Sequence, residues 1–115
     1  MSLSVIEYLG HIHKEASYLV RRLANVSREE FQADETLQRA CTRSLEIIGE
    51  ATKRVPEDFR LKHPQVDWRG MAGMRDRLIH DYLDVDYDIV WNVLTNKIPQ
   101  LATEIERIVG EEEQA

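Results

Sequence analysis

Apolar residues recur every three or four positions along most of the chain, which is the spacing of one face of an α-helix. Ser4 and Glu7 form the S-x-x-E pattern of a capping box, so they predict the start of a first helix. A second S-x-x-E at Ser27 predicts a short helical turn, and Asp34 can cap a longer helix. The apolar stripe predicted for the first helix consists of Val5, Tyr8, Leu9, Ile12, Ala16, Leu19, Val20 and Leu23.

The helix predicted after Asp34 contains a glycine within an otherwise regular pattern. Gly49 lies off the apolar stripe, and a glycine inside a helix costs about 1 kcal/mol relative to alanine. Two explanations stay open. In the first, another helix, from the same chain or from a second subunit, packs closely against the glycine. In the second, the glycine is tolerated on the surface. The stripe itself consists of Leu37, Cys41, Leu45, Ile48, Thr52 and Val55.

Prolines and an aspartate divide the middle of the chain. Pro56 and Pro64 bracket a short helical piece, because proline is tolerated at helix ends and not in helix interiors. Asp67 can then cap a further helix, whose apolar positions continue over residues 68–82.

The last part of the chain predicts a turn over residues 84–88, with Asp86 as the cap of a final helix. Pro99 predicts a kink in that helix, because it removes one backbone donor and clashes one turn back. The whole pattern predicts an all-α fold, an up-down helical bundle of four to five helices. Residues 1–110 form its single domain, and residues 111–115 are expected to be a disordered acidic tail.

Composition narrows the class of protein. Hydrophobic residues make up 43% and charged residues 31%, which is typical of a globular domain and not of a disordered chain. The single cysteine, Cys41, excludes an intrachain disulfide and favours a cytoplasmic protein. The first ten residues lack the basic and apolar blocks of a signal peptide, and no apolar run reaches the roughly 18 residues of a membrane span.

The net charge of −6 argues against a nucleic-acid-binding protein. Residues 53–80 are an exception, because they hold seven Lys or Arg against four acids. This segment predicts a local basic patch on an acidic protein. The alternative interpretation is an ordinary solvated surface of mixed charge.

No metal site is predicted. His11 and His13 are two residues apart on a helix, so they point to nearly opposite sides. Residues 84–88, "DVDYD", resemble the start of a calcium loop, but Ile89 and Thr95 stand where that loop needs glycine and glutamate. We therefore expect neither a metal nor a cofactor.

The candidate chemistry lies in "MRDRLIHDY", residues 74–82. On a regular helix Arg75 would lie near the middle of the apolar face, where its charge needs an anion or acceptors. His80 would then lie about 140° away from it. The two residues converge if the helix ends near His80, or if two copies meet across a two-fold axis. The alternative is a structural role, in which Arg75 pairs with an internal acid such as Glu46 or Glu50.

Three segments of the chain resemble the HEPN superfamily, specifically the HepT-like toxins of prokaryotic toxin–antitoxin pairs. They are "SLEIIGEATKR" (44–54), "WRGMAGMRDRLIHDY" (68–82) and "VDYDIVWNVLTNKIPQL" (85–101), and the similarity covers about residues 4–109. The toxin branch carries the motif R-x4-H-x-Y. Arg75, His80 and Tyr82 match it at every required position.

The resemblance implies an all-helical homodimer in which the two motifs face each other. It implies a metal-independent endoribonuclease, the toxin of a type VII-like HEPN–MNT system, with Arg75 and His80 as catalytic residues. The expected partners are RNA and a small nucleotidyltransferase antitoxin, which would transfer AMP to Tyr82. Asp76 is a candidate for orienting the arginine or the histidine, so Asp76 and Tyr82 would support the site.

These residue types suit RNA cleavage, because RNA carries its own nucleophile in the 2′-hydroxyl. Histidine can take a proton or donate one near neutral pH, and two copies of His80 would supply both base and acid. The planar fork of Arg75 can pair with the phosphate. Two alternatives remain: a non-catalytic helical module that binds nucleotides or docks to the nucleotidyltransferase, and a dimeric scaffold in which Arg75 is structural.

Overall fold

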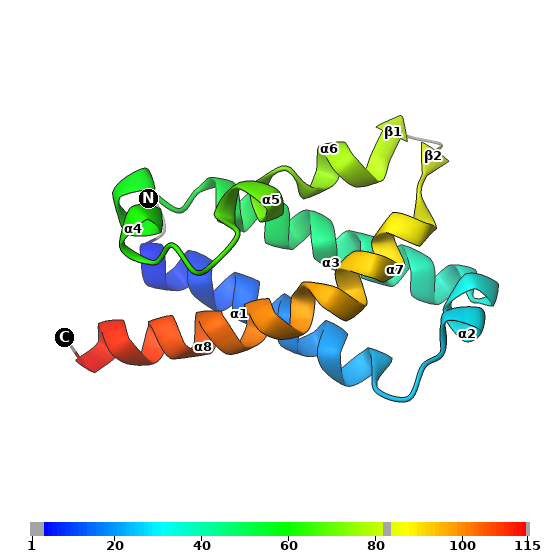
Figure 1. Cartoon of the computed structure of the whole chain (residues 1–115), viewed down its shortest axis with the longest axis horizontal. Coiled ribbons are helices and arrows are strands. Elements are labelled where there is room, and N and C mark those ends of the chain that lie inside the picture. Colours follow the sequence, from blue (N-terminus) through cyan, green and yellow to red (C-terminus); the bar gives the residue numbers. More distant parts are fainter. Residues whose placement is uncertain (1–3, 82–83, 115) are drawn as a thin grey trace.

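The computed structural model describes residues 4–81 and 84–114. This part of the chain forms eight helices and one pair of short strands (Figure 1). In chain order they are α1 (Val5–Leu23), α2 (Arg28–Ala33), α3 (Glu35–Lys53), α4 (Glu57–Lys62), α5 (Trp68–Ala72), α6 (Met74–Leu78), β1 (Ile79–Asp81), β2 (Asp84–Val85), α7 (Tyr87–Asn96) and α8 (Ile98–Gln114).

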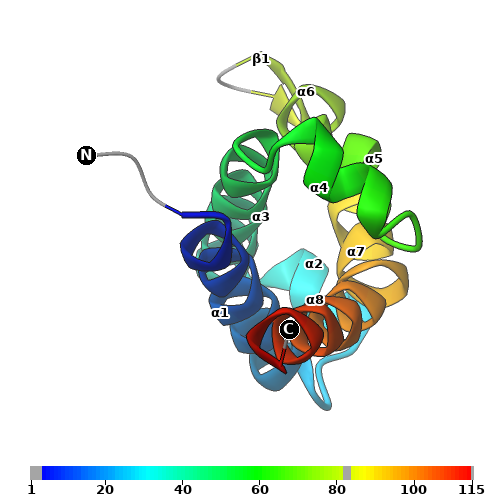
Figure 2. The same ribbon diagram turned by 90° about the vertical axis from the view of Figure 1, so that its left-hand side faces the viewer.

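The chain runs along the long axis of the molecule in four antiparallel segments (Figure 1). These are α1, α3, α5 with α6, and α7 with α8. Viewed from the end, these segments surround a common core (Figure 2). α1 packs against α3 and α8, and α3 also packs against α5 and α6. The predicted all-α up-down bundle is confirmed, with the antiparallel pair β1–β2 as a minor addition at one end.

The predicted helix starts are confirmed by their side-chain hydrogen bonds. Ser4 and Ser27 each form a complete capping box with the glutamate three residues later. The carboxylates of Asp34, Asp67 and Asp86 accept hydrogen bonds from the first turns of α3, α5 and α7. Each cap satisfies backbone N–H groups that have no partner inside the helix, so these local signals can be read without tertiary context.

The buried stripes follow the predicted spacing with one exception. All six positions predicted on α3 are buried, including Cys41. On α1 the buried residues are Leu9, Ile12, Ala16 and Leu19, whereas Val20 is 41% exposed. The prediction for Val20 was wrong because Val20 points about 100° away from its neighbour Leu19, and Leu19 is the one of the two that the packing of the bundle buries.

Gly49 is buried at the contact between α3 and the α5–α6 segment. A Cβ atom at this position would lie 3.3 Å from the carbonyl oxygen of Met71 and 3.7 Å from the Cβ of Met74. Of the two explanations left open by the sequence, close approach of another helix is the one observed, and that helix belongs to the same chain.

The structure corrects the continuous helix expected over residues 68–82. Helix α5 ends at a C-cap, Gly73, and α6 ends at Leu78. The following residues form β1, in which Ile79 pairs with Val85, while the N–H of Asp86 donates to the carbonyl of Leu78. Helix periodicity persists in the sequence here because short helical pieces still bury one side, so periodicity alone could not locate the breaks.

The last segment is also interrupted. α7 ends at Asn96, and α8 begins at Ile98 with Pro99 in its first turn, where a missing backbone N–H costs little. The predicted kink is therefore a break placed just before Pro99. The tail expected to be disordered from residue 111 differs in the structure, because α8 continues to Gln114 and Glu112 accepts a hydrogen bond from Lys62.

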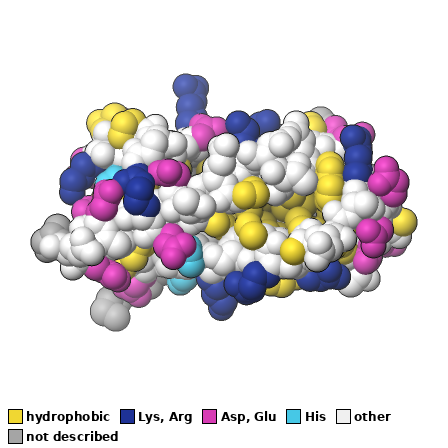
Figure 3. Space-filling model, turned by 60° about the horizontal axis from the view of Figure 1, so that its bottom comes forward, with side chains coloured by type: hydrophobic (Ala, Val, Ile, Leu, Met, Phe, Trp, Pro, Cys, Tyr) yellow, Lys and Arg dark blue, Asp and Glu magenta, His cyan; other side chains and the backbone are white. Residues whose placement is uncertain are grey.

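The face at the bottom of Figure 1, where α1 and α8 lie, is turned forward in Figure 3. Apolar side chains form a hollowed area on it, with Lys and Arg side chains along one edge (Figure 3). The bundle thus leaves apolar surface uncovered on this face. None of the described helices combines the length and the apolar character needed to cross a membrane.

Candidate active site

Arg75 is presented to solvent by the short helix α6. Met74 and Leu78, four residues apart, are buried, while Arg75, Asp76 and Arg77 between them are exposed. The sequence placed Arg75 near the middle of an apolar face, and that prediction was wrong. The break at Gly73 means that α5 and α6 do not share one helical wheel, so the angles expected from a continuous helix do not apply.

The backbone of His80 lies in β1, two residues beyond the end of α6. Ile79 pairs with Val85 and Asp81 pairs with Asp84, so β2 has no residue opposite His80. Such an irregularity bends a strand locally and is frequent next to active sites. The helix does end near His80, which was one of the two ways to bring it towards Arg75. The side chain of His80 and the whole of Tyr82 lie outside the described residues.

A groove of about 300 Å³ adjoins Arg75 on the outer face of α3. α3 supplies most of the residues that line it. In both ribbon views α3 lies between α1 and α6 (Figures 1 and 2). The groove is lined by Tyr8 and His11 from α1, by Arg43, Glu46, Ile47, Glu50 and Ala51 from α3 together with its C-cap residue Arg54, and by Arg75 from α6. We call this set of residues the α3 groove.

The acids that were candidates for pairing with Arg75 have other neighbours. Glu46 lies 3.7 Å from Arg43, and Glu50 lies 3.6 Å from Lys53. Among the acids whose side chains the structure describes, none forms an ion pair with Arg75. The scaffold interpretation, with Glu46 or Glu50 as its internal partner, therefore finds no support in this part of the chain.

The basic segment over residues 53–80 does not form one patch. Arg60 donates to the carbonyls of Val55 and Thr52, at 2.9 and 2.7 Å, and so satisfies carbonyl groups at the end of α3. Lys62 bonds Glu112 on α8. Of the seven Lys and Arg residues of this segment, all of them described, Arg54 and Arg75 alone line the α3 groove. The charge density along the sequence was therefore a poor guide to the charge density in space.

Sequence reasoning did not connect four of the arginine, histidine and tyrosine side chains of this groove with Arg75. Arg43 and Arg54 lie on the solvent side of α3, and Tyr8 and His11 lie on α1. The spacing from Arg43 through Glu46, Glu50 and Arg54 does place these side chains on one helical face. Nothing in that spacing indicates which other helix lies beside the face, so their proximity to Arg75 emerges only from the packing.

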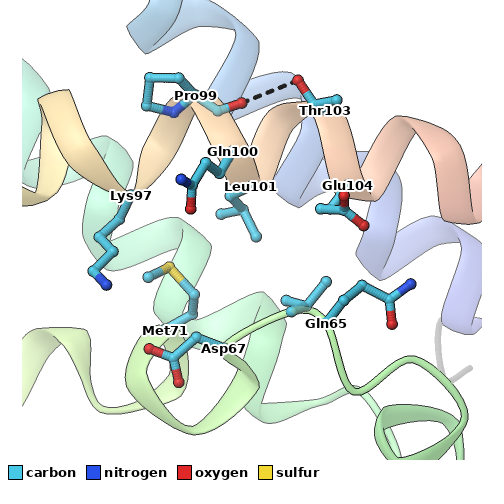
Figure 4. A pocket seen from close by; sticks show the side chains of 10 residues that line it. Gln65, Asp67, Met71, Lys97, Pro99, Gln100, Leu101, Thr103 and Glu104 are labelled. Atoms are coloured by element: carbon cyan, nitrogen blue, oxygen red, sulfur yellow. Dashed lines mark hydrogen bonds between the residues drawn. The ribbon is translucent and has the colours of Figure 1, made fainter.

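A larger pocket of about 590 Å³ lies between α8 and the turn that leads into α5 (Figure 4). Lys97, the C-cap residue of α7, and Gln100 in the first turn of α8 project towards Asp67 and Met71 on the other wall (Figure 4). Gln65 faces Glu104 (Figure 4). Arg75 and Asp76, the two predicted site residues whose side chains the structure describes, do not line it. Size alone therefore does not identify the site, and the α3 groove is the candidate because it contains Arg75.

Within residues 4–81 and 84–114, the side chains described include no group of three or more His, Cys, Asp or Glu placed to hold a metal ion. Asp76 is exposed, and no described side chain donates a hydrogen bond to it. The electrostatic character of the groove thus comes from Arg43, Arg54 and Arg75 opposed by Glu46 and Glu50, with His11 beside them.

Comparison with known proteins places this bundle in a family. The family model described as "Ribonuclease HepT-like" matches residues 12–108, which include the R-x4-H-x-Y motif and most of the α3 groove. The chain belongs to the HepT-like ribonuclease family of the HEPN superfamily. No solved structure gives a significant match.

Three relatives show the same assignment. A protein of Caldanaerobacter subterraneus subsp. tengcongensis, named as an RNase, is 47% identical over 105 residues, covering 91% of this chain and 94% of that protein. A Methanocaldococcus jannaschii protein, also named as an RNase, is 51% identical over 89 residues, or 74% of each chain. The probable ribonuclease HepT of Thermococcus cleftensis is 39% identical over 108 residues, covering 94% of this chain and 98% of that protein.

Proposed function

We propose that this chain is the toxin of a toxin–antitoxin pair, an endoribonuclease that cleaves RNA without a metal ion at a site built from Arg75 and His80. One observation carries the proposal: the motif arginine is exposed beside a groove with two further arginines, and it has no ion pair among the described side chains. An arginine held in this way is available for a phosphate.

The proposed reaction uses the 2′-hydroxyl of the substrate. A base removes its proton, O2′ attacks the adjacent phosphorus, and the bond from phosphorus to O5′ breaks. An acid donates a proton to O5′, leaving a 2′,3′-cyclic phosphate and a 5′-hydroxyl. His80 of one protomer and its copy in the partner would divide these two proton transfers, and Arg75 would stabilise the charge on the phosphate in the transition state.

The proposed assembly is a homodimer, because proton removal and proton donation require two groups and each chain supplies one motif histidine. Asp76 would act from its exposed place next to Arg75 by orienting the arginine or the imidazole. The proposed regulator is a nucleotidyltransferase antitoxin that transfers AMP to Tyr82. An added nucleotide two residues from His80 would block RNA by bulk and by charge.

Cleavage of a labelled RNA in the presence of a chelator tests the catalytic proposal. We expect the wild-type chain to form products that end in a 2′,3′-cyclic phosphate, and we expect His80→Ala and Arg75→Ala to lose activity. Arg77→Ala is the matched control, because Arg77 is exposed on the same helix and does not line the groove. A His80→Ala protein that degrades RNA as fast as wild type would overturn the proposal.

Co-expression with a nucleotidyltransferase encoded beside this chain tests the regulatory part. We expect the intact mass to rise by one AMP, and we expect Tyr82→Phe to prevent the increase while RNA cleavage persists. A wild-type chain that is harmless on expression, cleaves no RNA and still binds the nucleotidyltransferase would instead support the non-catalytic docking module.

A further inference from the structure

We infer that the α3 groove holds the RNA strand on both sides of the scissile phosphate, with Arg43 and Arg54 as phosphate-binding residues flanking Arg75. This inference rests on the proposed ribonuclease function and adds the substrate-binding residues. Arg43 lies on α3 and Arg54 is its C-cap residue. Both lie 21 or more positions before Arg75 in the sequence and meet it only in the fold.

The packing of α6 on α3 sets the order of the three arginines along the groove. α6 meets α3 at Gly49, where the Cβ of Met74 would be 3.7 Å from an added Cβ. Met74 precedes Arg75, and Gly49 lies about midway between Arg43 and Arg54 along α3. Arg75 therefore enters the groove beside the midpoint of the two α3 arginines.

The groove also offers enough length for a strand. Arg54, the C-cap residue of α3, lies eleven residues after Arg43, which corresponds to a rise of about 16 Å along the helix axis. Each nucleotide step of a stacked strand rises about 3.4 Å. The groove is thus long enough for a phosphate at Arg75 together with phosphates on either side of it.

The charge of the groove favours an anionic ligand. Arg43, Arg54 and Arg75 face two acids, Glu46 and Glu50, so the groove is net positive on a chain whose net charge is −6. Arg43 is 70% exposed and lies 3.7 Å from Glu46, a long contact that a phosphate can replace. Arg54 forms no ion pair with a described side chain. The guanidinium groups of Arg43 and Arg54 are therefore available to bind the phosphates of an anionic strand.

The shape and the side chains of the groove favour RNA over an acidic protein surface as the occupant. Guanidinium groups bind phosphates with two parallel hydrogen bonds, and a concave groove with an aromatic wall suits a single strand. Tyr8 supplies that wall from α1 and is half-buried, which keeps its ring in place for a base to stack on.

Binding of a fluorescent 2′-O-methyl RNA of twelve nucleotides tests the inference, because this probe lacks the nucleophile and stays intact with the wild-type chain. We expect Arg43→Gln and Arg54→Gln each to weaken binding at least fivefold at low salt. Each should also reduce the slope of log Kd against log salt by about 0.7, the contribution of one phosphate on a single strand. With cleavable RNA, KM should rise while kcat stays within about twofold.

Arg39→Gln is the control, because Arg39 is exposed on the same helix and pairs with Glu35, outside the groove. Circular dichroism melting of all variants verifies that they fold. Arg43→Gln and Arg54→Gln variants that bind RNA with the wild-type affinity and the wild-type salt slope would overturn the inference. Variants that keep RNA binding and lose binding to a nucleotidyltransferase would also overturn it. A wild-type chain that binds RNA through these arginines without cleaving it would instead refute the proposed function and leave the inference standing.

Discussion

The Cβ position of Gly49 lies 3.3 Å from the carbonyl oxygen of Met71, so α3 and the α5–α6 segment touch backbone to backbone. This contact sets how closely α6 approaches α3, and thereby where Arg75 meets the groove. A residue without a side chain on one helix thus positions a charged side chain on another.

Replacing Gly49 tests this relationship. Alanine normally stabilises an exposed helix position by about 1 kcal/mol relative to glycine. We expect Gly10→Ala to show that gain, because nothing lies within 4 Å of its Cβ position. We expect Gly49→Ala to lack the gain and to lower RNA cleavage, because Met71 must move away and carry α6 with it. Urea unfolding and a cleavage assay measure the two effects, and equal stabilisation by both substitutions would contradict the packing argument.

RNA cleavage should depend on the shape of the Arg75 side chain as well as on its charge. Lysine keeps the charge and loses the planar fork that binds two phosphate oxygens at once. We expect Arg75→Lys to reduce kcat/KM by about tenfold or more, and Arg75→Ala by about 100-fold or more. Arg77→Lys, on the same exposed side of α6, should change little. Full activity of Arg75→Lys would show that the site needs only a positive charge.

The stability that Glu112 contributes at the end of α8 should decrease at acid pH. The hydrogen bond from Lys62 Nζ, 3.0 Å from Glu112 Oε1, lowers the pKa of the Glu112 carboxyl from its ordinary value of 4.5. The folded chain then binds fewer protons than the unfolded chain, so this contribution to stability is present above pH 4.5 and is lost as the pH falls through the lowered pKa.

Glu112→Gln should therefore lower the urea midpoint at neutral pH and make it depend less on pH below about 5. Glu113→Gln is the control, because that neighbouring side chain is exposed. Identical pH profiles for wild type and Glu112→Gln would show that the contact to Lys62 does not contribute in solution.

Cys41 should be unreactive in the folded protein. Burial raises the pKa of its thiol to about 11 from an ordinary value of 9.0, and the residue is fully covered. Only the thiolate reacts, so at about pH 8 we expect labelling by a disulfide reagent to be about 100-fold or more slower than for a free thiol. Denaturation in guanidinium chloride should restore the ordinary rate. Fast labelling of the native chain would mean that this part of the core opens readily.

The features that the sequence determined by itself are those that depend on neighbours within one or two turns. Capping by Ser4, Ser27, Asp34, Asp67 and Asp86 was predictable because each side chain bonds backbone groups only two or three residues away. The buried stripe of α3 was predictable because helical spacing alone selects one face. Together these signals were sufficient for an all-α up-down bundle.

Only the tertiary structure decided what lies beside Arg75. The break at Gly73 and the pairing of Ile79 with Val85 end a helix whose periodicity the sequence continues, because the gain comes from contacts between distant segments. Arg43 and Arg54 lie near Arg75 for the same reason, because α6 packs on Gly49 of α3. No local sequence pattern predicts which helix packs at that position. The sequence specifies the chemistry of each side chain directly. The grouping of side chains into a site depends on how whole helices bury their apolar faces.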